Sequence, residues 1–154
     1  MNNALPQEGL EEIFDEITRE ITKCAAGISL CQGDTPLEGD VYTVHAAFER
    51  GFQTSLSFCA EAPLFARLTR YMMQEERITP KDVEDFSKEF FNILCGRLAS
   101  RLFQVTKIPS RFGIPVFYQG RYTPEGQGEH FIINYMSDEN ERAQLIHHTP
   151  KAVL

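Results

Sequence analysis

Four residues of the segment EDFSKEFFNILCGRL, residues 84–98, have types and a spacing that could do chemistry: Asp85, Glu89, Asn92 and Gly96. On a helix they would fall within roughly 60 degrees of one another and share one face. Residues three apart on a helix are neighbours, so the carboxylate of Glu89 and the amide of Asn92 would project together. A carboxylate can hold an ammonium group, and an amide can both donate to and accept from a water molecule. The pair could therefore align a water for attack without supplying a nucleophile.

An ordinary solvated helix face is the alternative, because acids and amides are the usual residues of such faces. Two residues weigh against it. Gly96 costs about 1 kcal/mol relative to alanine in mid-helix, and close approach by another backbone is a common reason for a glycine. Asn92 is an indifferent helix former where Glu, Lys or Gln would serve better. The residues alone leave both interpretations open.

The helix that would carry these residues is predicted over residues 80–103. Thr79 is suited to cap it, Pro80 fits its first position, and Asp82 favours the positive end of the helix dipole. Its opposite sector is apolar and is expected to pack against a sheet, leaving the four residues in solvent. This sector consists of Val83, Phe86, Phe90, Ile93, Leu94, Leu98 and Leu102.

Two further helices and several strands are expected around it. Apolar periodicity predicts helices over residues 8–24, with Gly27 as a stop signal, and 62–74, with Pro63 in the first turn. Strand composition covers residues 28–32, 41–48, 52–58, 112–120, 130–136 and 142–148. The second and third of these strands should form a hairpin with Gly51 in its turn. The tail from Thr149 is expected to fray.

The two halves of the chain show the same order of elements. A helix, the run GISLCQG from Gly27 and two strands are matched by a helix, the run GIPVFYQG from Gly113 and two strands. The order fits an internal αβββ duplication, but the shared letters are few, so the sequence leaves the repeat open. With a true repeat, the helices at 62–74 and 80–103 would sit between two half-sheets. The fold class predicted is α+β, a largely antiparallel sheet with long amphipathic helices packed on it.

Composition places limits on partners and location. At 154 residues, with 42% hydrophobic residues, the chain is predicted to be one globular domain over residues 1–154. A net charge of -7 without a basic run argues against nucleic acid as a partner. No apolar stretch is long enough to cross a membrane and the N-terminus lacks a signal pattern, so a cytoplasmic protein without membrane association is expected.

Cysteines and histidines suggest no metal site. Cys24, Cys31, Cys59 and Cys95 show no CxxC spacing and are predicted to be buried small hydrophobic residues. The adjacent pair His147 and His148 would point to opposite faces of a strand, which is poor geometry for chelation. No metal or cofactor bound by the chain itself is therefore expected.

The pattern Asp85-x-x-x-Glu89-x-x-Asn92, followed by Gly96, resembles the signature of the CheC and CheX type chemotaxis phosphatases, which dephosphorylate the response regulator CheY. The resemblance extends to the order of elements from about residue 28 to the last strand. It implies a CheC-like fold and docking of the motif helix on a receiver domain. That receiver carries a phosphoryl group on an aspartate, beside its own magnesium ion.

Roles for single residues follow from this resemblance. Asn92 would orient the attacking water in line with the scissile bond, and Glu89 would pair with the active-site lysine of the receiver. Asp85 matches the first motif position and would have a structural or docking role, while Gly96 would leave room for the partner. Mg²⁺ would then belong to the substrate.

A second copy of the motif is not expected. Glu8-x-x-x-Glu12-x-x-Asp15 has the spacing, but an ionised Asp15 would repel the phosphoryl group and cannot donate a hydrogen bond. One site per chain places the protein nearer the CheX branch, whose members are homodimers, and the resemblance therefore implies a homodimer.

Three residues depart from the family pattern. Arg97 follows the glycine, lies toward the apolar side of the helix and could alter docking. Phe90 and Phe91 are bulkier than usual between Glu89 and Asn92, and Phe91 is expected to be covered by another subunit. Besides a receiver phosphatase, two interpretations stay open: a non-catalytic module that binds a receiver or a flagellar switch component, and a domain whose polar face is only wet surface.

Overall fold

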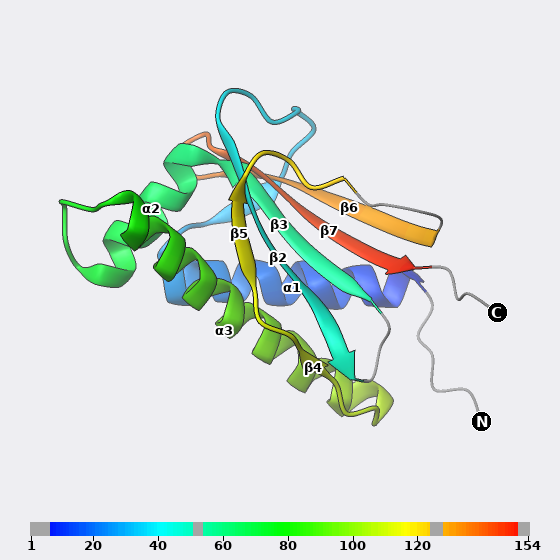
Figure 1. Cartoon of the computed structure of the whole chain (residues 1–154). Coiled ribbons are helices and arrows are strands. Elements are labelled where there is room, and N and C mark those ends of the chain that lie inside the picture. Colours follow the sequence, from blue (N-terminus) through cyan, green and yellow to red (C-terminus); the bar gives the residue numbers. More distant parts are fainter. Residues whose placement is uncertain (1–6, 51–53, 124–127, 151–154) are drawn as a thin grey trace.

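Seven antiparallel strands and three helices make up the part of the chain that the computed structural model describes, residues 7–50, 54–123 and 128–150. The helices are α1 (Gln7–Ala26), α2 (Ala62–Met73) and α3 (Pro80–Thr106). The strands are β1 (Leu30–Gln32), β2 (Val41–Arg50), β3 (Ser55–Glu61), β4 (Arg111–Phe112), β5 (Val116–Gln119), β6 (Gly128–Ser137) and β7 (Arg142–Pro150). The helices lie together on one side of the sheet (Figure 1), so the predicted α+β class with an antiparallel sheet is confirmed.

The strands of the two halves of the chain are arranged in a similar order on either side of the boundary between β3 and β7. The sheet runs β1-β6-β7-β3-β2, and both β4 and β5 pair with β2. Each half thus lends its first strand to the other half, since β1 pairs with β6 and β5 with β2. The arrangement supports the αβββ duplication. The helices do not lie between two half-sheets, however, because pairing of β3 with β7 joins the halves into one sheet.

The core lies between this sheet and the helices. Alternate residues of the central strand β3, such as Leu56 and Phe58, face the helices, and the Phe58 ring lies 5.7 Å from that of Phe90 on α3. The opposite face of the sheet has a small cluster of its own, in which Cys59 and Ile146 pack with Leu37. Strand β3 is therefore buried on both faces and anchors the layer that supports α3.

The ends of the helices follow local sequence signals. Thr79 Oγ1 accepts a hydrogen bond from the Asp82 N–H at 3.1 Å, and the Asp82 carboxylate accepts one from the Thr79 N–H at 2.9 Å, so a capping box starts α3. Helix α1 stops where Gly27 takes a φ of +67°, and a Cβ there would lie 2.5 Å from the ring of Tyr71. Both signals were predicted; α3 itself runs three residues further than expected, to Thr106.

The buried face of α3 differs from the predicted one. Ile93, placed in the packed sector, is 39% exposed, whereas Phe91, expected to need cover from another subunit, is fully buried within the chain. Helix α3 packs against α1 and α2 as well as the sheet, which turns its buried face toward Phe91. The buried positions are Ser87, Phe90, Phe91, Leu94, Cys95, Leu98, Leu102 and Thr106.

Other details also depart from expectation. Strand β3 begins at Ser55, three residues later than predicted, and the hairpin turn at Gly51 lies outside the described residues. Thr149, expected to begin a frayed tail, pairs with Glu129 as β7 continues to Pro150, and the tail from residue 151 lies outside the described residues. Of the four cysteines, Cys59 and Cys95 are buried as predicted, but Cys24 and Cys31 are exposed. No helix among the described residues is long and apolar enough to cross a membrane.

Candidate active site

The four predicted residues lie on the solvent-facing side of α3. Asp85, Glu89, Asn92 and Gly96 are all exposed, opposite the face that packs into the core. The helix has 27 residues and is capped at its start, so these side chains project from a rigid element. The structure therefore brings together the residues that the spacing predicted on one face.

The two acids of this face differ in what they contact. The Asp85 carboxylate accepts a hydrogen bond from Lys81 Nζ at 2.9 Å, one turn earlier, and this contact raises the pKa of Lys81. The Glu89 side chain has no hydrogen bond or ion pair with another residue in the described part of the chain. Its carboxylate is thus available to a partner's cation, while that of Asp85 is already shared with a lysine.

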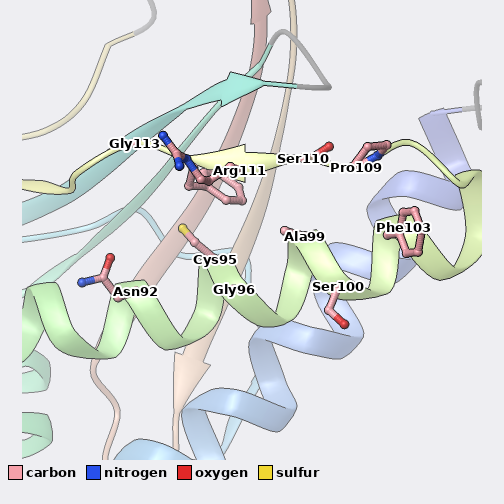
Figure 2. A pocket seen from close by; sticks show the side chains of 11 residues that line it. Asn92, Cys95, Gly96, Ala99, Ser100, Phe103, Pro109, Ser110, Arg111 and Gly113 are labelled. Carbon is pink, nitrogen blue, oxygen red and sulfur yellow. The ribbon is translucent and has the colours of Figure 1, made fainter.

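Asn92 lies where the polar face meets a hollow. Its amide has no hydrogen-bond partner within the described residues, and it lines a pocket of about 510 Å³ with Gly96. The pocket lies between α3 and residues 109–113, which lead into and through β4. Figure 2 shows Cys95 and Ala99 pointing from α3 toward the segment that carries Arg111 and Gly113. An exposed amide without an internal partner can take up a water molecule.

Gly96 has no intramolecular reason to be a glycine. A Cβ built on it would meet nothing within 4 Å apart from its chain neighbours and its own helix. Within the described part of the chain, no contact from another element therefore requires a glycine at this position.

Replacing Gly96 with alanine should raise the free energy of unfolding by about 0.5–1 kcal/mol, because alanine loses less backbone entropy in a helix and has open space here. Urea denaturation monitored by circular dichroism would measure the change. The same substitution at Gly27 is the matched control and should destabilise the chain, since Gly27 has a φ of +67° and abuts Tyr71. A loss of stability at Gly96 would contradict the open space.

Two further residues of the prediction have structural contacts. Asp15, the last position of the second motif-like spacing, accepts hydrogen bonds from Tyr135 Oη at 2.7 Å and Arg19 Nε at 3.0 Å. Its side chain thus ties α1 to β6. Arg97 is exposed rather than directed to the apolar side, and its guanidinium lies 3.4 Å from the Glu20 carboxylate on α1. Arg97 therefore bridges the two helices on a flank of the polar face.

The histidine pair is part of the core. His147 Nε2 lies 2.7 Å from Thr54 Oγ1, and its ring stacks on Phe131 with centroids 4.7 Å apart. Burial lowers the pKa of His147 to about 4. Within the described ranges, no group of three or more His, Cys, Asp or Glu side chains could hold a metal ion.

The segment that contains α3 matches a known family profile. The profile described as chemotaxis phosphatase CheX matches residues 42–135, more than half of the chain. The chain belongs to the CheX family. The match includes α3 with Glu89 and Asn92, and the family suggested by the sequence motif is confirmed. A search of curated proteins gives no match.

Solved structures share the fold at low sequence identity. A CheX chemotaxis protein from Desulfovibrio desulfuricans superposes with a TM-score of 0.77 at 15% identity, covering 90% of this chain and 97% of that one. CheX in the CheX–CheY–BeF3–Mg²⁺ complex from Borrelia burgdorferi gives 0.72 at 15%, covering 92% and 98%. Thermotoga maritima FliY gives 0.66 at 12%, covering 96% and 92%. At identities of 12–15%, these similarities show that the chain shares this fold, and they show nothing beyond the fold.

The pocket beside Asn92 is the part of the site that sequence reasoning missed. Its far wall comes from residues 109–113, which reach α3 because β4 pairs with the end of β2. A local signal in the sequence was Phe103, which continues the line of Gly96 and Ala99 along the helix and is 46% exposed.

Proposed function

We propose that this protein is a phosphatase of a phosphorylated CheY-like receiver domain. The observation that carries the proposal is the pair of unpartnered, exposed side chains Glu89 and Asn92, three residues apart on the rigid helix α3. The CheX family membership and the Borrelia CheX–CheY complex support the choice of partner.

The chemistry requires little from this chain. Water attacks the phosphorus of the receiver's aspartyl phosphate, the bond from phosphorus to the aspartyl oxygen breaks, and inorganic phosphate and a free carboxylate remain. Such transfers depend mainly on positioning and charge stabilisation. Asn92 accepts a hydrogen bond from the water and aims its oxygen, while Glu89 holds the receiver's lysine. The magnesium ion that neutralises the phosphoryl oxygens belongs to the receiver.

Asp85 and Gly96 have supporting roles. The Asp85 carboxylate is paired with Lys81. It therefore presents a polar surface to the partner and does not compete with Glu89 for the receiver's lysine. Gly96 lies one turn beyond Asn92 and carries no side chain, which lets the receiver backbone come close. Two side chains on a helix and a docking surface suffice for this reaction.

The direct test is release of inorganic phosphate from CheY phosphorylated in the presence of Mg²⁺, with and without this protein. A saturating amount of the wild-type chain should speed release by about 100-fold or more over the receiver's own hydrolysis, the range that a positioned hydrogen-bonding group supplies. A phosphoryl lifetime unchanged by an excess of the protein would rule out the proposal.

Replacing Glu89 with glutamine should raise KM for the phosphorylated receiver by about ten-fold, since a charge-assisted hydrogen bond contributes about 1.5 kcal/mol or more. The dependence of KM on salt should weaken as well. Glu84→Gln removes the same charge from the same helix, but Glu84 is already paired with Lys88 at 3.1 Å. This control should leave KM within about two-fold of the wild type. Equal effects of both variants would mean that Glu89 contributes only net charge.

A non-catalytic binding module is the second candidate. The fold shared with FliY, at a TM-score of 0.66, favours it, because FliY extends the same architecture beyond proteins described as CheX. A chain of this kind would bind a receiver and leave its phosphoryl lifetime unaltered. The phosphate-release assay therefore separates the two functions.

A homodimer is also part of the proposal, on the family resemblance. Light scattering during size-exclusion chromatography should give about twice the 17.6 kDa mass of the chain. A monomeric mass at micromolar concentration would rule out the proposed dimer and would leave the proposed chemistry of Glu89 and Asn92 unaffected.

A further inference from the structure

The pocket beside Asn92 continues the polar face of α3 toward the C-terminal end of the helix. Asn92 and Gly96 belong to both, and the α3 side of the pocket extends through Ala99 to Phe103. A partner that reaches Asn92 therefore also reaches the edge of this hollow, which is bounded on its other side by Phe112 and its neighbours.

The pocket has apolar walls and a floor of small residues. Phe103 is 46% exposed, and Phe112, whose ring is tilted against that of Phe48 of β2, forms part of the opposite wall. At Gly96 there is open space where a side chain would stand. A volume of about 510 Å³ is sufficient for a large apolar side chain with room around it. Apolar surface left open beside a polar contact site is typical of an interface.

Charge divides this surface into two ends. Asp85 and Glu89 lie toward the start of α3, and Glu89 has no partner in the described part of the chain. No acidic side chain is among the described residues that line the pocket, and its Arg111 is paired with Glu49 at 2.7 Å. The complementary partner surface is therefore cationic opposite Glu89 and apolar opposite the pocket.

We infer that the pocket between Gly96, Phe103 and Phe112 is a second anchor point for the receiver, and that it takes an apolar side chain from the receiver's surface. The inference rests on the proposed function, because it takes the receiver as the partner that engages Asn92. At about 1.5 Å of rise per residue, the pocket floor lies about 6 to 16 Å beyond Asn92 along the helix axis. The receiver side chain lies at that distance from the phosphorylated aspartate and determines which receivers bind well.

Two variants of opposite kind test the pocket. Ala99→Leu fills it from the α3 side, since Ala99 lines the pocket and has no part in the proposed contact at Gly96, and alanine and leucine are both good helix formers. Phe103→Ala instead removes one wall. Val105→Ala is the matched control, since Val105 is 44% exposed on the same helix and does not line the pocket.

The binding probe is purified CheY with Mg²⁺ and beryllium fluoride, titrated calorimetrically into each variant. Both pocket variants should raise Kd by about five-fold or more, as expected for truncating or blocking a buried apolar anchor, and Val105→Ala should stay within about two-fold. In the phosphate-release assay the pocket variants should raise KM and leave kcat within about two-fold. Wild-type affinity in both pocket variants would overturn the inference.

Failure of the proposed function gives a different result. If the wild-type chain binds the probe but releases no phosphate, weaker binding by the two pocket variants still supports the anchor point, while the phosphatase proposal is lost. If phosphate release is normal in both pocket variants and absent in Asn92→Ala, the phosphatase stands and the anchor point is wrong. A wild-type chain that binds no receiver overturns both.

Discussion

Replacing Asn92 with alanine should lower kcat for phosphate release from phosphorylated CheY by about 100-fold or more, in the range that loss of one positioned hydrogen-bonding group usually produces. The alanine can neither accept from nor donate to the water, so the attacking oxygen is no longer held in line. The receiver affinity should change by less than about three-fold, because the amide acts mainly in the transition state. Single-turnover phosphate release and calorimetry with the beryllium fluoride complex of CheY measure the two quantities.

Two companions make this result specific. Gln104→Ala removes an exposed amide from the same helix, on the flank that carries Arg97 and faces Glu20 of α1, and should leave release unchanged. Asn92→Asp keeps the size of the side chain but places a negative charge near the phosphoryl group, so it should be at least as slow as alanine. Unchanged release by Asn92→Ala, with the chain folded, would remove Asn92 from the mechanism.

The sequence predicted those parts of the site that depend on one helix. The Thr79 cap with Pro80 and Asp82 is a local signal, and the cap forms as expected, completed by a reciprocal hydrogen bond to Asp82 that was not predicted. Spacing along a helix then decides which residues share a face, so the common exposure of Glu89, Asn92 and Gly96 follows from their positions in the chain alone. Their catalytic and docking roles stay predictions.

Features that depend on contacts between distant segments could not be predicted in this way. The wall of the pocket reaches α3 through the pairing of Phe112 with Phe48, residues far apart in the chain. The single sheet likewise depends on the register of β3 with β7, for which turn signals give no information. The predicted burial holds for Cys59 and Cys95 but not for Cys24 and Cys31. Cys31 lies on the edge strand β1, and composition does not reveal which strand lies at an edge.

Phe91 shows how a helix face can be misread when its neighbours are unknown. A sheet alone would cover a sector centred on Phe90 and Leu94, and Phe91 would then lie near its border. Packing against α1 and α2 shifts the covered sector toward Phe91, so Phe91 lies within it and Ile93, on the opposite border, is left 39% exposed. The bulky departure beside Glu89 is thus a core residue that holds the motif helix in place.

Replacing Phe91 with alanine should therefore lower the free energy of unfolding by about 3–5 kcal/mol, the usual loss for a phenylalanine in a packed core. The side chain is fully buried in a single chain, so the loss does not depend on a second copy of the chain. Urea denaturation monitored by circular dichroism would measure it. Should the alanine variant fail to fold, Phe91→Leu gives a smaller change, about 1–2 kcal/mol, that can still be measured.

Phe103→Ala is the matched control, since it makes the same change on the same helix at a side chain that is 46% exposed. Its cost should be about 1 kcal/mol or less. Protein concentration then separates the two explanations for Phe91. If a second subunit covered Phe91, the difference between wild type and Phe91→Ala would grow with concentration, because dimerisation stabilises only the folded chain. Burial within the chain requires the same difference at low and high concentration, together with a far larger loss than Phe103→Ala produces.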